Sequence, residues 1–160
     1  MAYTGINKSS GHFNTITWAG NNSARSLTGV GHAPDLIWIK DRSENNHHAS
    51  FDKVRGVNKY ISSSSTTTEL NQPSSGYVSA FDSDGFSGVT GSSSYANWNK
   101  SGNNYVAWNW KANGAGSANT AGSVNSTVSV NSTAGFSIVK YVGDGATTTT
   151  VGHGLGVVPQ

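Results

Sequence analysis

The most strand-like segment of the chain is Tyr105-Val106-Ala107-Trp108-Asn109-Trp110-Lys111. It is rich in aromatic and β-branched residues, which suit strands because they pack well on a pleated surface. Aromatic residues stand at both odd and even positions, so we expect apolar contacts on both faces of this strand. The continuous apolar run Leu36-Ile37-Trp38-Ile39-Lys40 predicts a second strand of the same kind. We therefore expect Trp38, Trp108 and Phe51 to be buried in strands.

The composition around these segments disfavours helices. Ser, Thr, Asn and Gly supply 77 of the 160 residues. The first three compete with the helical backbone through their own side-chain hydrogen bonds, and Gly loses entropy in a helix. The aromatic content of 10% is enough to bury a core. We expect an all-β fold, an antiparallel β-sandwich of two sheets, with an extended C-terminal segment.

Charge and hydropathy exclude several classes of partner. The 10 basic and 8 acidic residues are spread without a Lys/Arg stripe, so no nucleic-acid partner is expected. The sequence contains no apolar run of membrane-spanning length, so no membrane insertion is expected. The chain has no cysteine, which excludes a disulfide framework and thiolate zinc sites.

An internal repeat organises the chain. Phe136-Ser137-Ile138-Val139-Lys140-Tyr141-Val142-Gly143 aligns with Phe13-Asn14-Thr15-Ile16-Thr17-Trp18-Ala19-Gly20, and the segment 154–159 aligns with 29–34 after a two-residue insertion. Such a long period indicates duplication of a whole domain. The ranges we expect are an N-terminal arm at 1–12, a β-sandwich at 13–113, a Gly/Ser/Thr/Asn-rich linker or edge strand at 114–135, and the start of a second, incomplete repeat at 136–160.

The second copy predicts an unusual pairing. Residues 136–142 have the alternating pattern of the first strand, but the counterpart of Leu36 to Lys40 does not follow them in this sequence. An isolated strand leaves its backbone groups unpaired at high cost. We expect 136–142 to pair with an exposed edge of the sandwich or with another chain.

Catalytic and metal-binding patterns are weak, so we expect no enzyme and no cofactor. Glu44 and Glu69 have no acidic partner two residues away, as glycoside hydrolysis on a strand face would require. No Gly-x-Ser-x-Gly motif is present. Adjacent strand residues point to opposite faces, so the rings of His47 and His48 would not share one ion.

Two loops contain candidate ligand-binding residues. The turn at Asp82-Ser83-Asp84-Gly85 resembles part of a calcium loop, which makes Asp82 and Asp84 weak calcium candidates. It lacks a third oxygen ligand and a distal Glu, and a hairpin turn explains it better. Sugar sites stack aromatic rings on pyranose faces and surround them with polar groups. The glycan-binding candidates are therefore Tyr95, Asn97, Trp98 and Asn99, although Trp98 could instead fold back as a lid on the core.

An ordered set of motifs resembles one known family. It includes Ala33-Pro34-Asp35-Leu36-Ile37-Trp38-Ile39-Lys40, Phe51-Asp52-x-Val54-Arg55-Gly56, Phe81-Asp82-Ser83-Asp84-Gly85-Phe86 and Tyr105-Val106-Ala107-Trp108-x-Trp110-Lys111. With these motifs in this order, the chain is similar to a domain that is repeated in tail fibres and other structural proteins of marine bacteriophages, including those of cyanobacteria. The resemblance implies a concanavalin A-like jelly-roll sandwich on a virion, often in tandem, without established catalytic residues.

We therefore expect a bacteriophage virion protein, a tail-fibre or surface-fibre lectin-like domain that supports attachment to host glycans. The alternative is a purely architectural virion protein, such as a decoration, adaptor or capsid-associated subunit without a ligand. In both cases the expected partners are other virion subunits, and homo-oligomers are favoured. If the domain is lectin-like, host surface glycans are expected partners as well.

Overall fold

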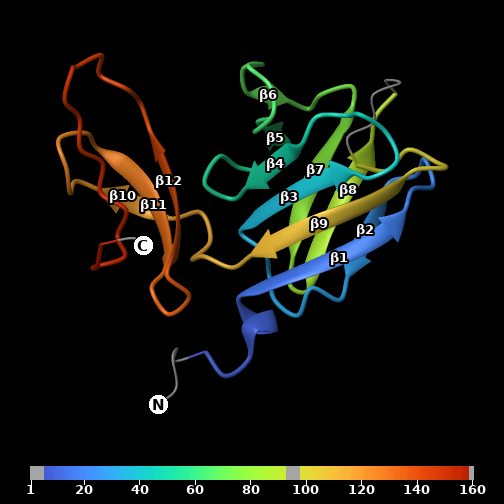
Figure 1. Cartoon of the computed structure of the whole chain (residues 1–160), viewed down its shortest axis with the longest axis horizontal. Helices are drawn as coiled ribbons and strands as arrows, with labels where there is room; N and C mark the ends of the chain where they lie inside the picture. The colour runs from blue at the N-terminus through green and yellow to red at the C-terminus, as the bar shows by residue number, and fades with distance from the viewer. Residues whose placement is uncertain (1–5, 93–97, 159–160) are drawn as a thin grey trace.

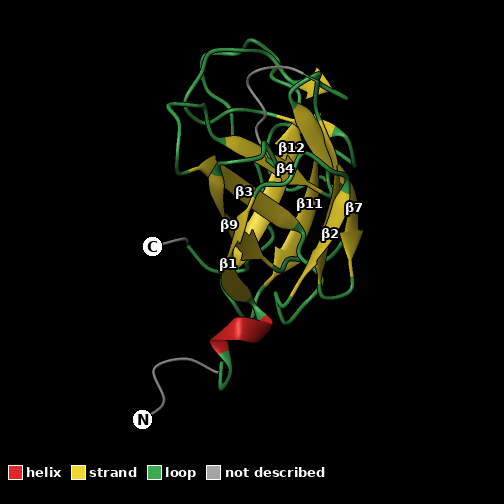
Figure 2. Ribbon diagram, turned by 90° about the vertical axis from the view of Figure 1, so that its right-hand side faces the viewer, coloured by secondary structure: helices red, strands yellow, loops and turns green. Residues whose placement is uncertain are grey.

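The computed structural model describes residues 6–92 and 98–158. Its strands are β1 (Phe13–Ala19), β2 (Arg25–Thr28), β3 (Leu36–Asp41), β4 (Ala49–Asp52), β5 (Lys59–Tyr60), β6 (Leu70–Asn71), β7 (Gly76–Asp82), β8 (Gly85–Thr90), β9 (Asn104–Trp110), β10 (Ser117–Asn119), β11 (Ser126–Asn131) and β12 (Phe136–Tyr141). The short 3-10 helix η1 (Ser9–Gly11) leads into β1 (Figure 2). Within the described ranges, no helix has the length and apolar character needed to cross a membrane.

Two antiparallel sheets form the predicted sandwich. One has the strand order β1-β9-β3-β4 and the other β2-β8-β7, and Figure 1 shows β3, β9 and β1 in front of β7 and β8. The core lies between the sheets, and both contribute to it. Its buried members are Trp18, Leu27, Ile37, Ile39, Ala49, Phe51, Tyr60, Val78, Phe86, Trp98, Tyr105 and Ala107. The all-β sandwich expected from the composition is confirmed.

The hairpin predicted at Asp82 to Gly85 joins β7 to β8, with Asp82 opposite Gly85. Gly85 is required at this turn because a Cβ there would lie 1.9 Å from the carbonyl oxygen of Leu27 on the neighbouring strand β2. The turn therefore also fixes how closely β2 approaches β8.

The alternation of the four-stranded sheet corrects one prediction about the core. Phe51 is 1% exposed, as expected. Trp38 and Trp108 are only half-buried, because the alternation directs Ile37, Ile39, Tyr105 and Ala107 into the core and turns both tryptophans to the outer face. The second sheet packs against the inner face, where its Val78 and Phe86 join the core.

The C-terminal region forms its own sheet, which lies beside one end of the sandwich (Figure 1). Its strand order is β10-β11-β12, and Val128 of β11 faces Val139 of β12. The prediction of a strand at 136–142 is confirmed, but its predicted pairing with the edge of the sandwich is wrong. The segment 114–135 supplies strands β10 and β11, so β12 pairs with a strand that directly precedes it.

Candidate functional site

Of the four loop residues predicted to bind glycans, the two that the structure describes, Trp98 and Asn99, are buried. Trp98 is fully buried: its Nε1 donates to the carbonyl of Val89, and its own carbonyl accepts from Nε1 of Trp18. Asn99 is also fully buried and donates to Asn21 and to the carbonyl of Ser23. A ring without exposed surface cannot stack on a sugar, so Trp98 is the core lid and not a ligand platform. Tyr95 and Asn97 lie outside the described residues.

Gly88 shows why Trp98 reaches the core. A Cβ on Gly88 would lie 2.4 Å from the indole of Trp98, so the ring occupies the space that a side chain on β8 would fill. Trp98 also lies near Trp18 and Phe86, with ring centroids 6.1 and 6.0 Å away. The glycine and the tryptophan are thus one packing unit.

The calcium candidates have protein partners. The two carboxylate oxygens of Asp84 accept the backbone N–H groups of Gly29 and Gly31, and these bonds lower the pKa of Asp84 below its ordinary value. Asp82 accepts from the hydroxyl of Ser87. Across the described parts of the chain, no three His, Cys, Asp or Glu side chains gather in a way that could hold a metal ion. Asp84 therefore holds the segment after β2 against the hairpin turn, and Asp82 bonds within the β7–β8 hairpin.

The two glutamates considered for hydrolysis form separate surface ion pairs. Glu44 pairs with Lys100, and the hydrogen bond from Lys100 lowers the pKa of Glu44. Glu69 pairs with Lys59 at 3.7 Å. The carboxylate near Glu44 is that of Asp41, since the side-chain amide of Asn46 donates to both, but Asp41 is buried and accepts hydrogen bonds from its own loop.

The outer face of the four-stranded sheet instead presents an aromatic cluster, which we define as Trp38, His48, Trp108 and Trp110. Trp38 on β3 lies directly opposite Trp108 on β9 in the strand register. Trp110 follows Trp108 by two residues and so points to the same face. His48 precedes β4 by one residue, and Ser50 of β4 is opposite Trp38. Two neighbouring strands and one loop therefore bring four rings together.

The rings are in contact and line a cavity of about 250 Å³. The centroid of Trp38 lies 5.7 Å from that of Trp108, 6.4 Å from that of Trp110 and 5.4 Å from that of His48. All four side chains are half-buried. The cluster therefore leaves aromatic surface accessible at the bottom of a shallow hollow, which is the property that the buried Trp98 lacks.

Two polar atoms of the cluster have no protein partner. Nε1 of Trp38 and Nδ1 of His48 are inaccessible to solvent, and neither has a hydrogen-bond partner among the described residues. An unpaired buried polar atom is costly, and native structures pair nearly all of them. Because both atoms are covered, a ligand at this face would contact the rings and not these two atoms.

The charge around the cluster is low and positive. Burial, followed by the positive charges of Lys40 and His47, lowers the pKa of His48, so its ring is neutral at pH 7. The ammonium of Lys40 donates to the carbonyls of Asp41, Glu44 and Asn46, which holds it in the β3–β4 loop. None of the residues that line the cavity is acidic.

The loop that leads to His48 is well fixed. The buried carboxylate of Asp41 accepts from the backbone N–H groups of Ser43 and Glu44 and from the side-chain amides of Asn46 and Asn103. Further along, the backbone N–H of His48 donates to the hydroxyl of Ser64. The aromatic cluster is therefore positioned by strands β3 and β9 and by the hydrogen-bonded loop that carries His48.

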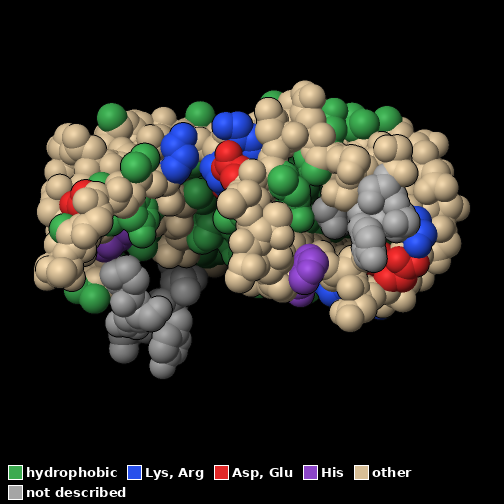
Figure 3. Space-filling view, turned by 90° about the horizontal axis from the view of Figure 1, so that it is seen from above, with side chains coloured by type: hydrophobic (Ala, Val, Ile, Leu, Met, Phe, Trp, Pro, Cys, Tyr) green, Lys and Arg blue, Asp and Glu red, His purple; other side chains and the backbone are tan. Residues whose placement is uncertain are grey.

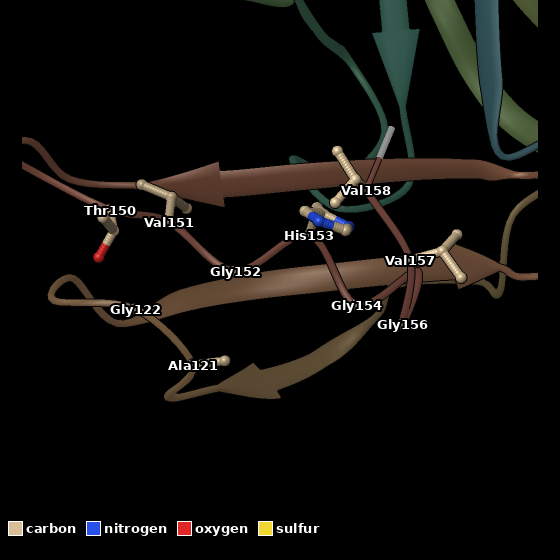
Figure 4. A pocket seen from close by; sticks show the side chains of 10 residues that line it. All are labelled: Ala121, Gly122, Thr150, Val151, Gly152, His153, Gly154, Gly156, Val157 and Val158. Carbon is tan, nitrogen blue, oxygen red and sulfur yellow. The ribbon is translucent and has the colours of Figure 1, made fainter. Parts of the chain in front are cut away.

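A larger hollow, of about 750 Å³, lies in the C-terminal region. Figure 4 shows that Ala121 and Gly122 from the turn after β10, together with the segment 150–158, line it. Its lining is mostly glycine and valine, and Nδ1 of His153 already accepts the backbone N–H of Leu155. It offers little that could recognise a ligand.

The surface seen from above the sandwich carries mostly small polar side chains and backbone, with scattered charges (Figure 3). No basic groove is visible on this face. This agrees with the low charge content of 11%.

Sequence reasoning missed the aromatic cluster although it noticed the tryptophans. A signal was present, because Trp108 and Trp110 are two residues apart and must share a face of their strand. The sequence does not show which face of β9 is covered. It also does not show that β3 places Trp38 beside Trp108 and Trp110.

The comparisons with known proteins add a family. One family model, described as a domain of unknown function (DUF7483), matches residues 8–160. The matched range contains both the sandwich and the C-terminal sheet, so the family is defined by the two together. No curated protein and no solved structure matches the chain.

Proposed function

We propose that this chain, which belongs to the DUF7483 family, is a non-catalytic structural domain of a bacteriophage virion that binds host surface glycans through its aromatic cluster. The observation that carries this proposal is the set of three tryptophans that line one cavity on an outer sheet face. Aromatic rings stack on the apolar faces of sugars, and a few polar groups orient the ligand. The virion setting comes from the resemblance of the sequence motifs to phage fibre domains.

The same rings would also suit a quaternary ammonium ion, which aromatic cages bind by cation–π attraction. The charge near the aromatic cluster favours a sugar instead. The nearby positive charge of Lys40 would repel a bound cation, as it disfavours the charged form of His48. The cavity lining has no acidic residue that would balance a bound cation. A ligand without net charge fits this environment better.

A glycan array tests the proposal directly. The wild-type chain should bind a subset of glycans, and Trp38→Ala and Trp108→Ala should each remove that binding while the fold is retained. Thr17→Ala is the matched control, because Thr17 lies exposed on β1 opposite Val106 of β9, away from the aromatic cluster. A blank array for the wild-type chain, or binding that survives both tryptophan substitutions, would reject a glycan role for the cluster.

The architectural alternative is favoured by a different region. Four of the exposed large hydrophobic side chains lie in the C-terminal region: Tyr141, Val142, Val157 and Val158. Strand β12 is also an edge strand, paired only with β11 among the described strands. Exposed strand edges and apolar side chains promote association between chains.

Sedimentation of the wild-type chain and of Val142→Lys tests this alternative. An architectural subunit that uses this surface should form oligomers that Val142→Lys weakens, since Val142 is 83% exposed and its substitution disturbs no core. A wild-type chain that stays monomeric across concentrations and shows no glycan binding would contradict both readings.

A further inference from the structure

The aromatic cluster does not end at Trp110. The ring of Trp110 stacks on Phe136 of β12, with centroids 6.0 Å apart and planes 20° apart. Phe13 of β1 contacts the same indole at 4.9 Å. The rings of His48, Trp38, Trp110 and Phe136 therefore follow one another at centroid separations of 5.4, 6.4 and 6.0 Å.

This row connects the two parts of the molecule. Phe136 belongs to the C-terminal sheet, whereas the other three rings belong to the sandwich. The side-chain amide of Asn131 bonds to Nδ1 of His12 and to the carbonyl of Lys111, and Ser129 accepts the backbone N–H of Asn113.

A further contact lies away from the row. The ammonium of Lys140 on β12 donates to the carbonyl of Val54, in the loop that follows β4. The C-terminal sheet is thus attached to the sandwich at more than one point, and Phe136 has a defined place at the end of the row.

We infer that the binding site is composite: the ligand is an uncharged oligosaccharide chain that lies along this row of rings, and Phe136 of the C-terminal sheet provides its last contact. This inference rests on the proposed function, because it extends the same site. Trp38 and Trp110 lie on the outer face of the four-stranded sheet, with His48 and Phe136 next to them at the two ends of the row, and one sugar ring covers about one aromatic ring. A row of successive rings therefore matches several linked sugar units better than a single terminal sugar.

The lining chemistry supports an uncharged chain. Neither the cavity lining nor Phe136 contributes a charged group at pH 7, because His48 is neutral there. Acidic sugars would need a free cation, but Lys40 already donates to three carbonyls. The separate glycine-lined hollow near His153 has no aromatic ring and takes no part.

Titration calorimetry with graded oligosaccharides tests the inference. The probes are β-1,4-linked glucose, mannose and xylose oligomers, each from the disaccharide to the hexasaccharide. For the series that binds, the affinity of the wild-type chain should increase with length. Phe136→Leu keeps apolar volume but removes the ring, so it should lower the affinity for the longest oligomer by about three- to tenfold and leave the shortest unchanged.

Two further variants separate this inference from the proposed function. Trp38→Ala should weaken binding at every length. Tyr141→Leu, which removes a half-exposed ring from the other end of β12, should leave the length dependence intact. Binding that requires Trp38 but is independent of length, or that Phe136→Leu leaves unchanged at every length, overturns the composite site and preserves the proposed function. The absence of binding by all three series and by the array overturns both.

Discussion

The two faces of the four-stranded sheet carry similar residues and have different roles. On the inner face, Ile37, Phe51 and Tyr105 are at most 1% exposed and pack against the opposite sheet. On the outer face, Trp38 and Trp108 are half-buried and contact other aromatic rings. Aromatic content alone therefore does not indicate a core. Apolar residues are fully buried where the second sheet packs against them, and the aromatic rings on the outer face keep part of their surface exposed.

The sharpest test of this comparison is a pair of truncations, one on each face. Phe51→Ala should lower the free energy of unfolding by about 3–5 kcal/mol, because it leaves a cavity in a close-packed core. Trp38→Ala should cost about 1–2 kcal/mol, since its ring is only half-buried in the folded chain. Urea denaturation of both variants measures the difference. Equal losses would mean that the outer face is as fully covered as the inner one.

A smaller effect is expected where the core has no room for an added atom. Gly88→Ala should lower the free energy of unfolding by about 1–3 kcal/mol, because the new Cβ overlaps the indole of Trp98. Gly143→Ala is the matched control, since nothing lies within 4 Å of a Cβ at that position. If the two variants melt at the same temperature, Trp98 does not occupy the inner layer described above.

The smallest effect concerns pH and the outer face. The pKa of His48 is lowered from its ordinary value of 6.5, so the unfolded chain binds more protons than the folded chain just below that pH. The stability contributed by the neutral ring is present above about pH 6.5 and is lost as the pH falls through the folded pKa. His48→Gln should therefore reduce the drop in melting temperature between pH 7 and pH 5. Part of the drop should remain, because burial also lowers the pKa of His32.

A pH dependence identical in the wild-type chain and in His48→Gln would contradict the burial of this ring in the aromatic cluster. The glycan-binding assay supplies an independent readout of the same group. Acidification should change binding by the wild-type chain more than binding by His48→Gln, because only the wild-type site gains a charge.

Local patterns predicted the local structure of the sandwich well. The Asp-Gly turn signal located the β7–β8 hairpin, and the apolar runs located β3 and β9. These patterns could not show which face of each strand is buried, because alternation assigns residues to two faces without indicating which face another layer covers. Trp38 and Trp108 were misplaced for this reason, whereas Phe51 was placed correctly.

The candidate site was predicted less well, and long-range contacts explain why. Trp98 follows polar residues and resembles an exposed loop aromatic, but its burial depends on Gly88, ten residues earlier on another element. The aromatic cluster requires the register between β3 and β9, which lie far apart in the sequence. The pairing of β12 also depended on β11, within a segment whose composition equally favoured a linker.

The division of the tryptophans between the two faces also has an optical consequence. Two of the five, Trp18 and Trp98, lie in the core, and the other three belong to the aromatic cluster. A dissolved collisional quencher reaches the cluster and is excluded from the core. The intrinsic fluorescence of the folded chain therefore divides into a quenchable part and a protected part, so that occupation of the outer face and loss of the fold can be followed separately in one sample without an attached dye.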